Sequence, residues 1–328
     1  MRKKFIRSIL AIGIVAATVT AADAQKVYRK DYVEPSGWAL GINFGMTDLW
    51  ADVGTKKIMD HYNNGKYFDR PCFLGGLFGR YTIHPALCVR LGLNYGTLYA
   101  SDSWNENKAR SATYISDDYY QRFLRNQDVR TNIWEGNIMF EFNPRRLNIG
   151  PRTARGRFNP YILAGFGYFH FNPQGTLPSR GGAVASKWVN LKDLHLEGDG
   201  WGAGYPAEIK YWQMEVPFGL GVRWSLGQKL DLGLEYIYHY CFTDYLDNVS
   251  ANYVDPNEFD KRLAPDKAQV AREMSDKSWQ ITNLSTVKAG DIRGNKSVND
   301  AYSVINITFF YKVKSRKNPW WWYDDENR

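Results

Sequence analysis

The chain has 328 residues, a formal net charge of +8 and a mean hydropathy of −0.48, a value that is ordinarily typical of soluble proteins. Its length suits one large domain or two ordinary ones. After the N-terminal segment, no run approaches the roughly 18 apolar residues that a transmembrane helix needs, which excludes helical membrane proteins. Three cysteines cannot all pair, and we expect Cys72, Cys88 and Cys241 to be free thiols.

The N-terminus has the pattern of a secretory signal peptide. Four basic residues precede or border an apolar stretch over residues 9–21, and Ala22-Asp23-Ala24 fits A-x-A cleavage before Gln25. We therefore expect a signal peptide at 1–24, a folded domain at 25–313 and a C-terminal tail at 314–328.

From residue 211 to residue 226, large apolar side chains alternate with polar or small ones. The apolar positions are Trp212, Met214, Val216, Phe218, Leu220, Val222, Trp224 and Leu226. A period of two indicates a β-strand, because successive side chains point to opposite faces. A strand of about 16 residues is longer than the usual strand of a soluble sheet. The other face carries Glu215 and Arg223. This strand therefore separates an apolar environment from a polar interior, as in a transmembrane β-barrel.

The same alternation recurs along the chain. The predicted strands are 38–46, 73–83, 87–95, 134–142, 162–171, 211–226, 230–242 and 303–313. The phase of 162–171 is ambiguous, because this segment is rich in glycine. An even number of strands favours a closed barrel, whose half-polar strands explain the low hydropathy. The aromatic content of 16% suits interfacial girdles.

The lengths of the predicted connections alternate between long and short. They are 47–71, 84–86, 100–128, 144–157, 172–210, 227–228 and 244–301. Outer-membrane barrels have long external loops, short periplasmic turns and periplasmic termini. We therefore predict an all-β fold, an eight-stranded antiparallel transmembrane β-barrel with long extracellular loops and short periplasmic turns, located in the cell outer membrane and in contact with its lipid bilayer.

The inward-facing positions of these strands collect charged side chains. They are Arg80, Arg90, Glu135, Glu141, Glu215, Arg223, Asp231, Glu235 and His239. An eight-stranded barrel is just wide enough for side chains to fill, and isolated buried charges are expensive. We expect these charges to pair into a solid plug; the alternative is a polar pore.

Catalysis has little support in the sequence. Glu135 and Glu141 are carboxylates of the type used in acid–base chemistry, and His170 and His239 lie near external strand ends, where a hydrolase would place a base. No serine or aspartate constellation accompanies them, and the five histidines show no metal-binding spacing such as H-E-x-x-H. We expect no enzyme activity, no catalytic residues, no cofactor and no metal.

The last long loop carries the most local signals. We expect Asp244, Asp247 and Ser250 to hydrogen-bond to nearby backbone; a calcium site is the alternative, although the D-x-D-x-D-G spacing is absent. The composition of residues 265–277 predicts a short helix, and residues 290–295 predict a turn.

Basic and aromatic residues gather on the expected periplasmic side. They are Arg145, Arg146, Arg152, Arg155 and Arg157 in one turn and Trp320, Trp321 and Trp322 in the tail. Two interpretations remain open: anchoring to anionic lipid head groups, or docking of a partner protein, for which Arg and Trp are favoured. Nucleic acid is not an expected partner outside the cell membrane.

Several segments resemble the PorG-type outer-membrane barrel family. They are FTDYLDNVSANYVD, PFGLGVRWSLGQKLDLGLEYIYHY, GDIRGNKSVNDAYSVINITFFYKV, NPYILAGFGYFHFNP and, more weakly, GWALGINFGMTDLWADVG. The loop residues within the resemblance are Asp244, Tyr245, Asp247, Ser250, Arg293, Gly294 and Asn295. The arginine-rich turn and the tryptophan tail match no motif of this family.

The resemblance implies membership of the type IX protein secretion system. PorG-like barrels there associate with the periplasmic ring of a lipoprotein (PorK) and its partner (PorN). The chain would then be an accessory membrane anchor that docks this ring, and not the translocation pore. The alternatives are a stand-alone surface barrel for adhesion or envelope integrity, a small channel, and an outer-membrane enzyme.

Overall fold

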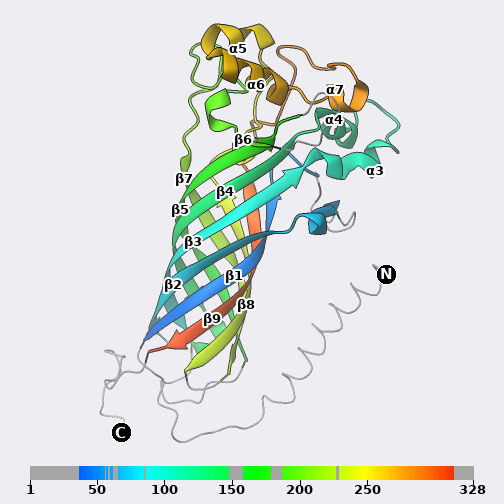
Figure 1. Cartoon of the computed structure of the whole chain (residues 1–328). Coiled ribbons are helices and arrows are strands. Elements are labelled where there is room, and N and C mark those ends of the chain that lie inside the picture. Colours follow the sequence, from blue (N-terminus) through cyan, green and yellow to red (C-terminus); the bar gives the residue numbers. More distant parts are fainter. Residues whose placement is uncertain are drawn as a thin grey trace, which may run out of the picture.

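Eight antiparallel strands close into a barrel in the computed structural model (Figure 1), which describes residues 37–313 except 56, 58–59, 62–65, 85, 148–157, 179–186 and 227–228. The barrel strands are β1 (Trp38–Trp50), β2 (Cys72–His84), β3 (Leu87–Ser101), β4 (Asp128–Phe142), β5 (Phe158–Thr176), β7 (Trp212–Ser225), β8 (Leu230–Cys241) and β9 (Ala301–Lys312). Their order is β4-β3-β2-β1-β9-β8-β7-β5, and pairing of β4 with β5 closes the ring. The predicted fold class is confirmed. Among the described residues, no helix is long and apolar enough to cross a membrane.

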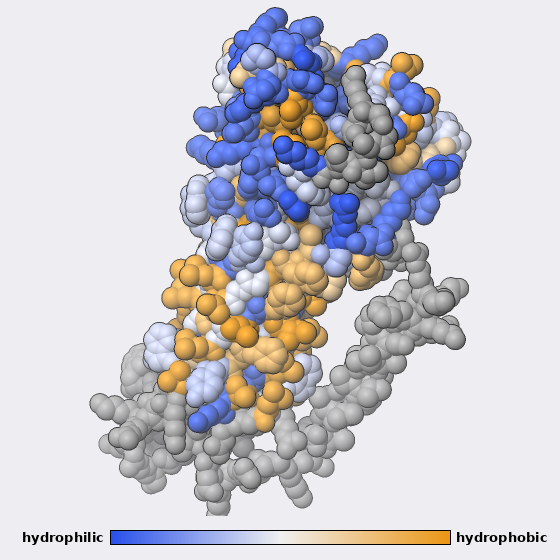
Figure 2. Space-filling model, in the orientation of Figure 1, coloured by the Kyte–Doolittle hydropathy of each residue, from blue (hydrophilic) through white to orange (hydrophobic). Residues whose placement is uncertain are grey.

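The alternation of β7 divides lipid-facing from inward-facing side chains as predicted. Met214 and Leu220 are 55% and 63% exposed, whereas Glu215 and Arg223 are 0% and 4% exposed. Figure 2 shows the resulting apolar belt around the lower barrel, below a hydrophilic region. Such an outward apolar band is the defining surface of a membrane β-barrel.

Aromatic side chains on the outer wall form two bands. Ring pairs toward the loop end are Tyr95–Trp134 and Tyr168–Trp212, at 4.5 and 5.4 Å between centroids; pairs toward the turn end are Trp38–Tyr81 and Phe158–Trp224, at 4.9 and 5.5 Å. Aromatic girdles at these two levels are typical of the two membrane–water interfaces.

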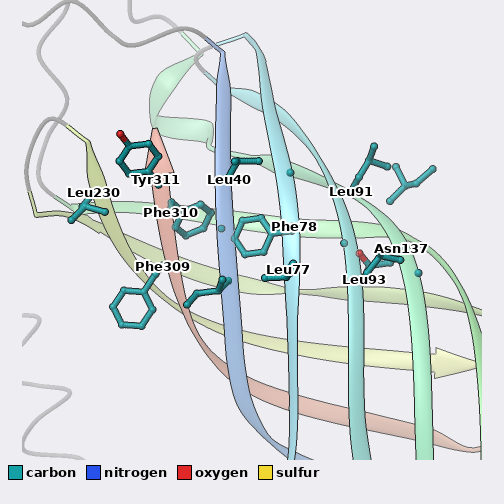
Figure 3. A pocket seen from close by; sticks show the side chains of 16 residues that line it. Leu40, Leu77, Phe78, Leu91, Leu93, Asn137, Leu230, Phe309, Phe310 and Tyr311 are labelled. Atoms are coloured by element: carbon teal, nitrogen blue, oxygen red, sulfur yellow. The ribbon is translucent and has the colours of Figure 1, made fainter. Parts of the chain in front are cut away.

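A shallow hollow of about 850 Å³ interrupts the apolar belt (Figure 3). It lies over the lower halves of β1 to β4 and β9, where outward Gly79 has open space on its side-chain face. Leucines such as Leu77 and Leu93 border it. Because its walls are apolar and belong to the belt, the hollow suits lipid chains and no polar ligand.

The long connections fold together into a cap at one end of the barrel (Figure 1). We call the described parts of 51–71, 102–127, 177–211 and 242–300 the loop cap, and the opposite end the turn end. The cap contains η1 (Lys66–Asp69), η2 (Asp102–Asn105), α3 (Glu106–Ala109), α4 (Asp118–Arg125), β6 (Trp188–Asn190), η4 (Lys192–Leu194), α5 (Pro256–Arg262), α6 (Pro265–Ser275) and α7 (Trp279–Thr282); η3 (Pro144–Arg146) lies at the turn end. Helix α6 confirms the prediction for 265–277, whereas the other helices and β6 were not predicted.

Local capping explains where α4 and α5, two of the helices that were not predicted, begin. The side chain of Asp117 accepts a hydrogen bond from the N–H of Tyr119 at the start of α4, which ends at Asn126 in a left-handed conformation (φ 53°). At the start of α5, the side chain of Asp255 accepts a hydrogen bond from the N–H of Asn257, and Pro256 lies in the first turn. Asp at the N-cap and Asn at the C-terminus are favoured for these geometries.

Candidate functional site

The turn-side half of the lumen is filled by a network of charges, which we call the charged plug (Arg80, Arg90, Glu141, Arg223 and Glu235). Glu141 accepts hydrogen bonds from Arg80 at 2.7 Å and Arg223 at 2.6 Å, and also from Arg90. Arg90 also donates hydrogen bonds to Glu235 at 2.7 and 3.0 Å. All five residues are buried. The prediction that the lumen charges pair is confirmed here.

Aromatic rings complete the packing of the charged plug. The guanidinium of Arg90 lies 4.3 Å from the ring centroid of Phe78, and that of Arg223 lies 4.2 Å from Phe310. Closer to the turn end, Asp231 pairs with Lys312 at 2.6 Å. Cation–π contacts at these distances stabilise desolvated cations, so the guanidinium groups are held by both carboxylates and rings.

A second group, which we call the loop-side cluster (Glu135, Glu215, His239 and Tyr302), lies nearer the cap. The Tyr302 hydroxyl is 2.9 Å from Glu135 Oε2 and 2.9 Å from Glu215 Oε2. His239 Nδ1 is 3.2 Å from Glu215 Oε1, and its ring stacks on Tyr302 at 4.2 Å between centroids. Between this cluster and the charged plug is a cavity of about 20 Å³, room for about one water molecule.

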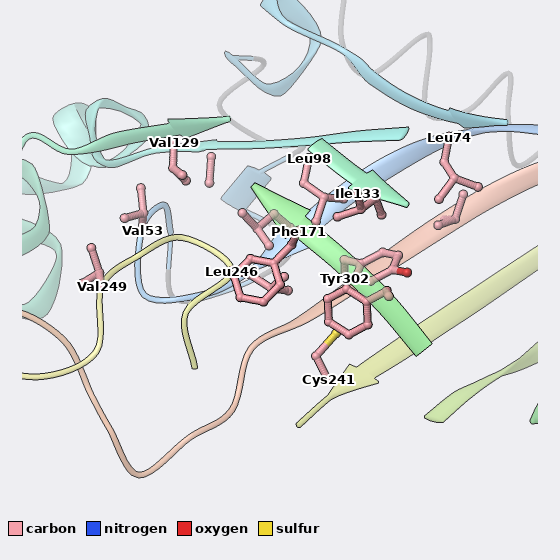
Figure 4. Close-up of a cluster of buried hydrophobic side chains, with 14 of the residues drawn as sticks. Val53, Leu74, Leu98, Val129, Ile133, Phe171, Cys241, Leu246, Val249 and Tyr302 are labelled. Atoms are coloured by element: carbon pink, nitrogen blue, oxygen red, sulfur yellow. The ribbon is translucent and has the colours of Figure 1, made fainter. Parts of the chain in front are cut away.

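An apolar core closes the barrel above the loop-side cluster (Figure 4). Leu246 and Val249 of the cap pack with Ile133 and Phe171 of the strands, and all four are at most 1% exposed. A second core joins helices α5 and α6 to the third long loop through Phe259, Met274 and Leu194. The cap is therefore a folded part of the molecule and covers the lumen.

The loop residues singled out by sequence converge inside the cap. Arg293 donates to Glu197 at 2.7 Å and to the carbonyl of Asn248 at 2.6 Å, while Glu197 accepts the backbone N–H groups of Ser250 and Ala251 at 2.9 and 2.8 Å. Arg293 and Glu197 are both 1% exposed at the side chain. This buried pair ties the third long loop to the fourth.

Gly294 and Asn295 extend the same junction to the first loop. The N–H of Asn295 donates to Asp52, and a Cβ on Gly294 would lie 2.6 Å from the backbone nitrogen of Ser250. A side chain at position 294 would thus force these loops apart. Tyr245 packs against the apolar core. Tyr245, Arg293, Gly294 and Asn295 thus all take part in contacts within the loop cap.

The expected hydrogen bonding of the acidic loop residues is confirmed for Asp247 and corrected for Asp244. Asp247 accepts from Val249 at 2.8 Å and from distant Val53 at 2.7 Å. The Asp244 carboxylate is buried but accepts no backbone hydrogen bond. Asp300, for which no prediction was made, accepts a hydrogen bond from the backbone N–H of Leu246 at 2.8 Å.

We expect the cap to lose stability as pH rises. Burial, with repulsion from Asp247 and partial relief from Ser250, raises the pKa of Asp244 to about 8; burial and Asp52 raise the pKa of Asp247 to about 7. Unfolded aspartate titrates near pH 3.9, so the folded cap binds more protons between about pH 4 and pH 8. Its stability is fully present below that window and falls across it.

The measurement is urea unfolding of the cap at pH 5 and pH 8. Asp244→Asn should raise the free energy of unfolding at pH 8 by roughly 1–2 kcal/mol and flatten the pH dependence. Asp266→Asn, on an exposed position of α6, serves as the control and should change it by less than about 0.5 kcal/mol. A pH dependence unaltered by Asp244→Asn would contradict the assignment.

The predicted docking residues at the turn end are only partly within the described chain. Arg145 lies in η3 and is exposed, and Arg146 is in the same short helix. The other members are outside the described residues: Arg152, Arg155, Arg157, Trp320, Trp321 and Trp322. Their role in docking remains a prediction.

The candidate acid–base groups do not form a catalytic constellation. Glu135 and Glu141 belong to separate clusters, and Glu141 is held by arginines. His239 is 3% exposed under the cap, and His170 stands on the outer wall beside Trp212. The three cysteines are free thiols, as predicted.

The polar pairs that hold the cap together were not predicted from the sequence. Arg125 forms a buried ion pair with Asp102 at 2.8 Å, and Glu197 forms one with Arg293. Lys277 reaches Asp128 at 2.7 Å. Each pair joins segments far apart in sequence, so no local spacing signals it.

No family model and no curated protein matches the chain. Among solved structures, it is similar to Ail, the attachment invasion locus protein of Yersinia pestis, solved with the heparin analogue sucrose octasulfate (8% identity, TM-score 0.34, 84% of this chain and 98% of that one). It is also similar to Neisserial surface protein A (9%, 0.34, 85% and 98%) and to OprG from Pseudomonas aeruginosa (10%, 0.35, 86% and 98%). Similarity at this level says nothing about function.

The closed strand order, the apolar belt and the two aromatic bands define the class. The chain is an eight-stranded antiparallel β-barrel of the kind that spans bacterial outer membranes. Within this class, it carries a filled lumen and a folded loop cap.

Proposed function

We propose that this chain is a non-enzymatic, non-conducting outer-membrane barrel that anchors the periplasmic ring of the type IX protein secretion machinery. The observation that carries the non-conducting part is the filled lumen: charged plug, loop-side cluster and apolar core follow one another along the barrel axis. The cavity that the described residues leave between the clusters has about 20 Å³, too little for a continuous water column. A barrel closed in this way acts through its ends.

The assignment to secretion is supported by the PorG-like segments, FTDYLDNVSANYVD and GDIRGN among them, whose residues meet in the cap. Ring docking would use the turn end, where exposed Arg145 begins a run of five arginines without an acidic residue. Arginine is favoured at protein interfaces because its planar group makes several directed hydrogen bonds. A periplasmic ring lipoprotein is the proposed partner.

The test is co-purification of ring lipoproteins with the barrel after crosslinking of intact outer membranes. Replacing Arg145, Arg146, Arg152, Arg155 and Arg157 by serine should reduce recovery of the ring at least about tenfold, the effect of losing roughly 1.4 kcal/mol or more. The matched control replaces five exposed cap lysines by serine: Lys187, Lys210, Lys267, Lys288 and Lys296. Unchanged recovery in the arginine variant would remove the turn end from the proposal.

Conductance gives a separate test of the closed lumen. Purified barrel in a planar bilayer should show no discrete channel openings, because ions have no continuous aqueous path. Deleting residues 243–299 should leave the barrel non-conducting, since the charged plug stays in place. Regular single-channel steps from the intact chain would overturn the non-conducting assignment.

A stand-alone surface barrel for adhesion or envelope integrity is the second candidate. The observation in its favour is the loop cap, which is folded around two apolar cores and still exposes Leu284, Ile292 and Val298 at 73%, 81% and 61%. Exposed apolar side chains on a rigid support suit a binding surface. A deletion strain that secretes cargo normally but has altered surface binding would favour this candidate over ring docking.

A further inference from the structure

Three metal-ligating side chains from different strands converge beneath the cap. Glu135 comes from β4, Glu215 from β7 and His239 from β8, and one ligand atom of each lies within 4.8 Å of the others. All three are at most 3% exposed. They belong to neither the charged plug nor the proposed ring-docking surface, so this site goes beyond the proposed function.

The separations fit a single small cation. His239 Nδ1 is 3.2 Å from Glu215 Oε1 and 3.9 Å from Glu135 Oε2. Ligands bound tetrahedrally to Zn²⁺ at 2.0–2.1 Å stand about 3.3 Å apart. The distance of 3.2 Å is close to that value, 3.9 Å exceeds it by about half an ångström, and all three ligand atoms lie within 4.8 Å of one another. Side-chain adjustments would therefore bring the three atoms around one ion.

Among the described residues, carboxylates outnumber cationic side chains at the loop-side cluster. Every carboxylate of the charged plug contacts a guanidinium, but among the described residues Glu135 and Glu215 contact no Arg or Lys. Their other neighbours are neutral donors: Asn94 and Asn137 at Glu135, and Tyr302 at both. Two buried carboxylates beside one imidazole carry net negative charge unless they take up protons or bind a cation, because unpaired buried charge is expensive.

The adjoining cavity provides a second, independent sign. It borders His239 and Asn137, and it is also lined by Asn306. Asn306 is 3% exposed, and its Oδ1 has no hydrogen-bond partner. A water molecule here would satisfy that oxygen and is the usual further ligand where a protein supplies three.

We propose that Glu135, Glu215 and His239 bind one divalent transition-metal ion, Zn²⁺ by preference. A mixed nitrogen and oxygen set favours Zn²⁺ over Ca²⁺ or Mg²⁺, which take oxygen ligands almost exclusively. Two carboxylates and a neutral imidazole around Zn²⁺ form a neutral unit, which suits the buried setting. The ion ties β4, β7 and β8 together below the cap, and its role is structural, since the apolar core denies substrates access.

Burial also determines how the ion is exchanged. The apolar core lies over the cluster and the charged plug lies under it, so the ion enters before the cap closes. Folded protein should therefore keep its metal in the presence of a chelator and release it only on unfolding.

The experiment refolds untagged full-length mature chain from urea into detergent micelles with ZnCl₂ or with EDTA. Metal content is measured by mass spectrometry after gel filtration in EDTA, together with the Tm. The expected result is one tightly held zinc per chain and a higher Tm for the zinc-refolded sample. Glu215→Gln and His239→Asn should each lower zinc affinity by about 100-fold or more and remove the zinc-dependent rise in Tm.

Glu235→Gln is the matched control, because Glu235 is an equally buried lumen carboxylate that contacts Arg90 and Tyr161 instead. It should keep zinc, whatever its effect on the Tm. The direction in which Glu215→Gln changes the Tm decides between the two cases, even if the variant folds well. Without a metal site, Glu215→Gln removes an unmatched buried charge, and the Tm stays level or rises in both refolding conditions. That outcome, or a zinc-free wild-type chain after refolding with ZnCl₂, would overturn the proposal.

Discussion

Replacing Glu141 by leucine should lower the free energy of unfolding of the barrel by roughly 3–5 kcal/mol or prevent folding. Its carboxylate is the common partner of Arg80, Arg90 and Arg223 in the charged plug. Without it, three buried guanidinium groups share one remaining carboxylate, that of Glu235, and only Arg90 contacts it. Urea unfolding in detergent micelles, followed by tryptophan fluorescence, measures the loss.

Two further variants separate charge from packing. Glu141→Leu combined with Arg80→Met and Arg223→Met removes the unmatched cations and should recover most of the lost stability, because buried ionic networks are often replaceable by apolar side chains. Arg145→Ser at the turn end, exposed and outside the plug, should be nearly neutral. A cost below about 1 kcal/mol for Glu141→Leu alone would mean that the plug does not hold the barrel together.

The barrel could be predicted because the alternation of neighbouring residues shows which side chains face outward and which face inward in each strand. In β7 and β8, a strict period of two gives the direction of every side chain, and the even strand count and connection lengths give closure. The phase of strand β5 was ambiguous because the segment is rich in glycine, and its inward face does not resolve the ambiguity. Its inward residues Phe169 and Phe171 are apolar, because they pack under the cap and not in the polar lumen.

Which charged residues pair with one another inside the lumen could not be predicted from the sequence. Arg90 donates a hydrogen bond to Glu235, which lies 145 positions later in the chain. This contact depends on the stagger of all eight strands. For the same reason, histidine spacing alone gave no sign of His239 beside Glu135 and Glu215. Helix α6 was found because Pro265 and a run of helix-forming residues are local signals.

Replacing Arg293 by alanine should open the loop cap while leaving the barrel folded. Its partner Glu197 would remain buried with backbone N–H donors but no cation, at a cost of roughly 3–5 kcal/mol. Opening of the cap would then increase more than about 100-fold. Limited proteolysis should cleave the cap loops correspondingly faster. Arg110→Ala, at an exposed pair with Glu106, is the control and should cost at most about 1 kcal/mol.

The Arg293 variant also separates the two proposed functions, because it damages one end of the barrel only. If the barrel works by docking a periplasmic ring, Arg293→Ala should leave ring recovery and secretion intact, since the turn end keeps its strands and arginines. If it works through its cap, surface binding should be lost at unchanged barrel content of the membrane. Arg293→Met with Glu197→Gln removes both charges and should restore part of the cap's protease resistance. Failure of this pair to restore resistance would show that hydrogen bonds to Asn248 and Ser250, rather than the buried charges, hold the cap.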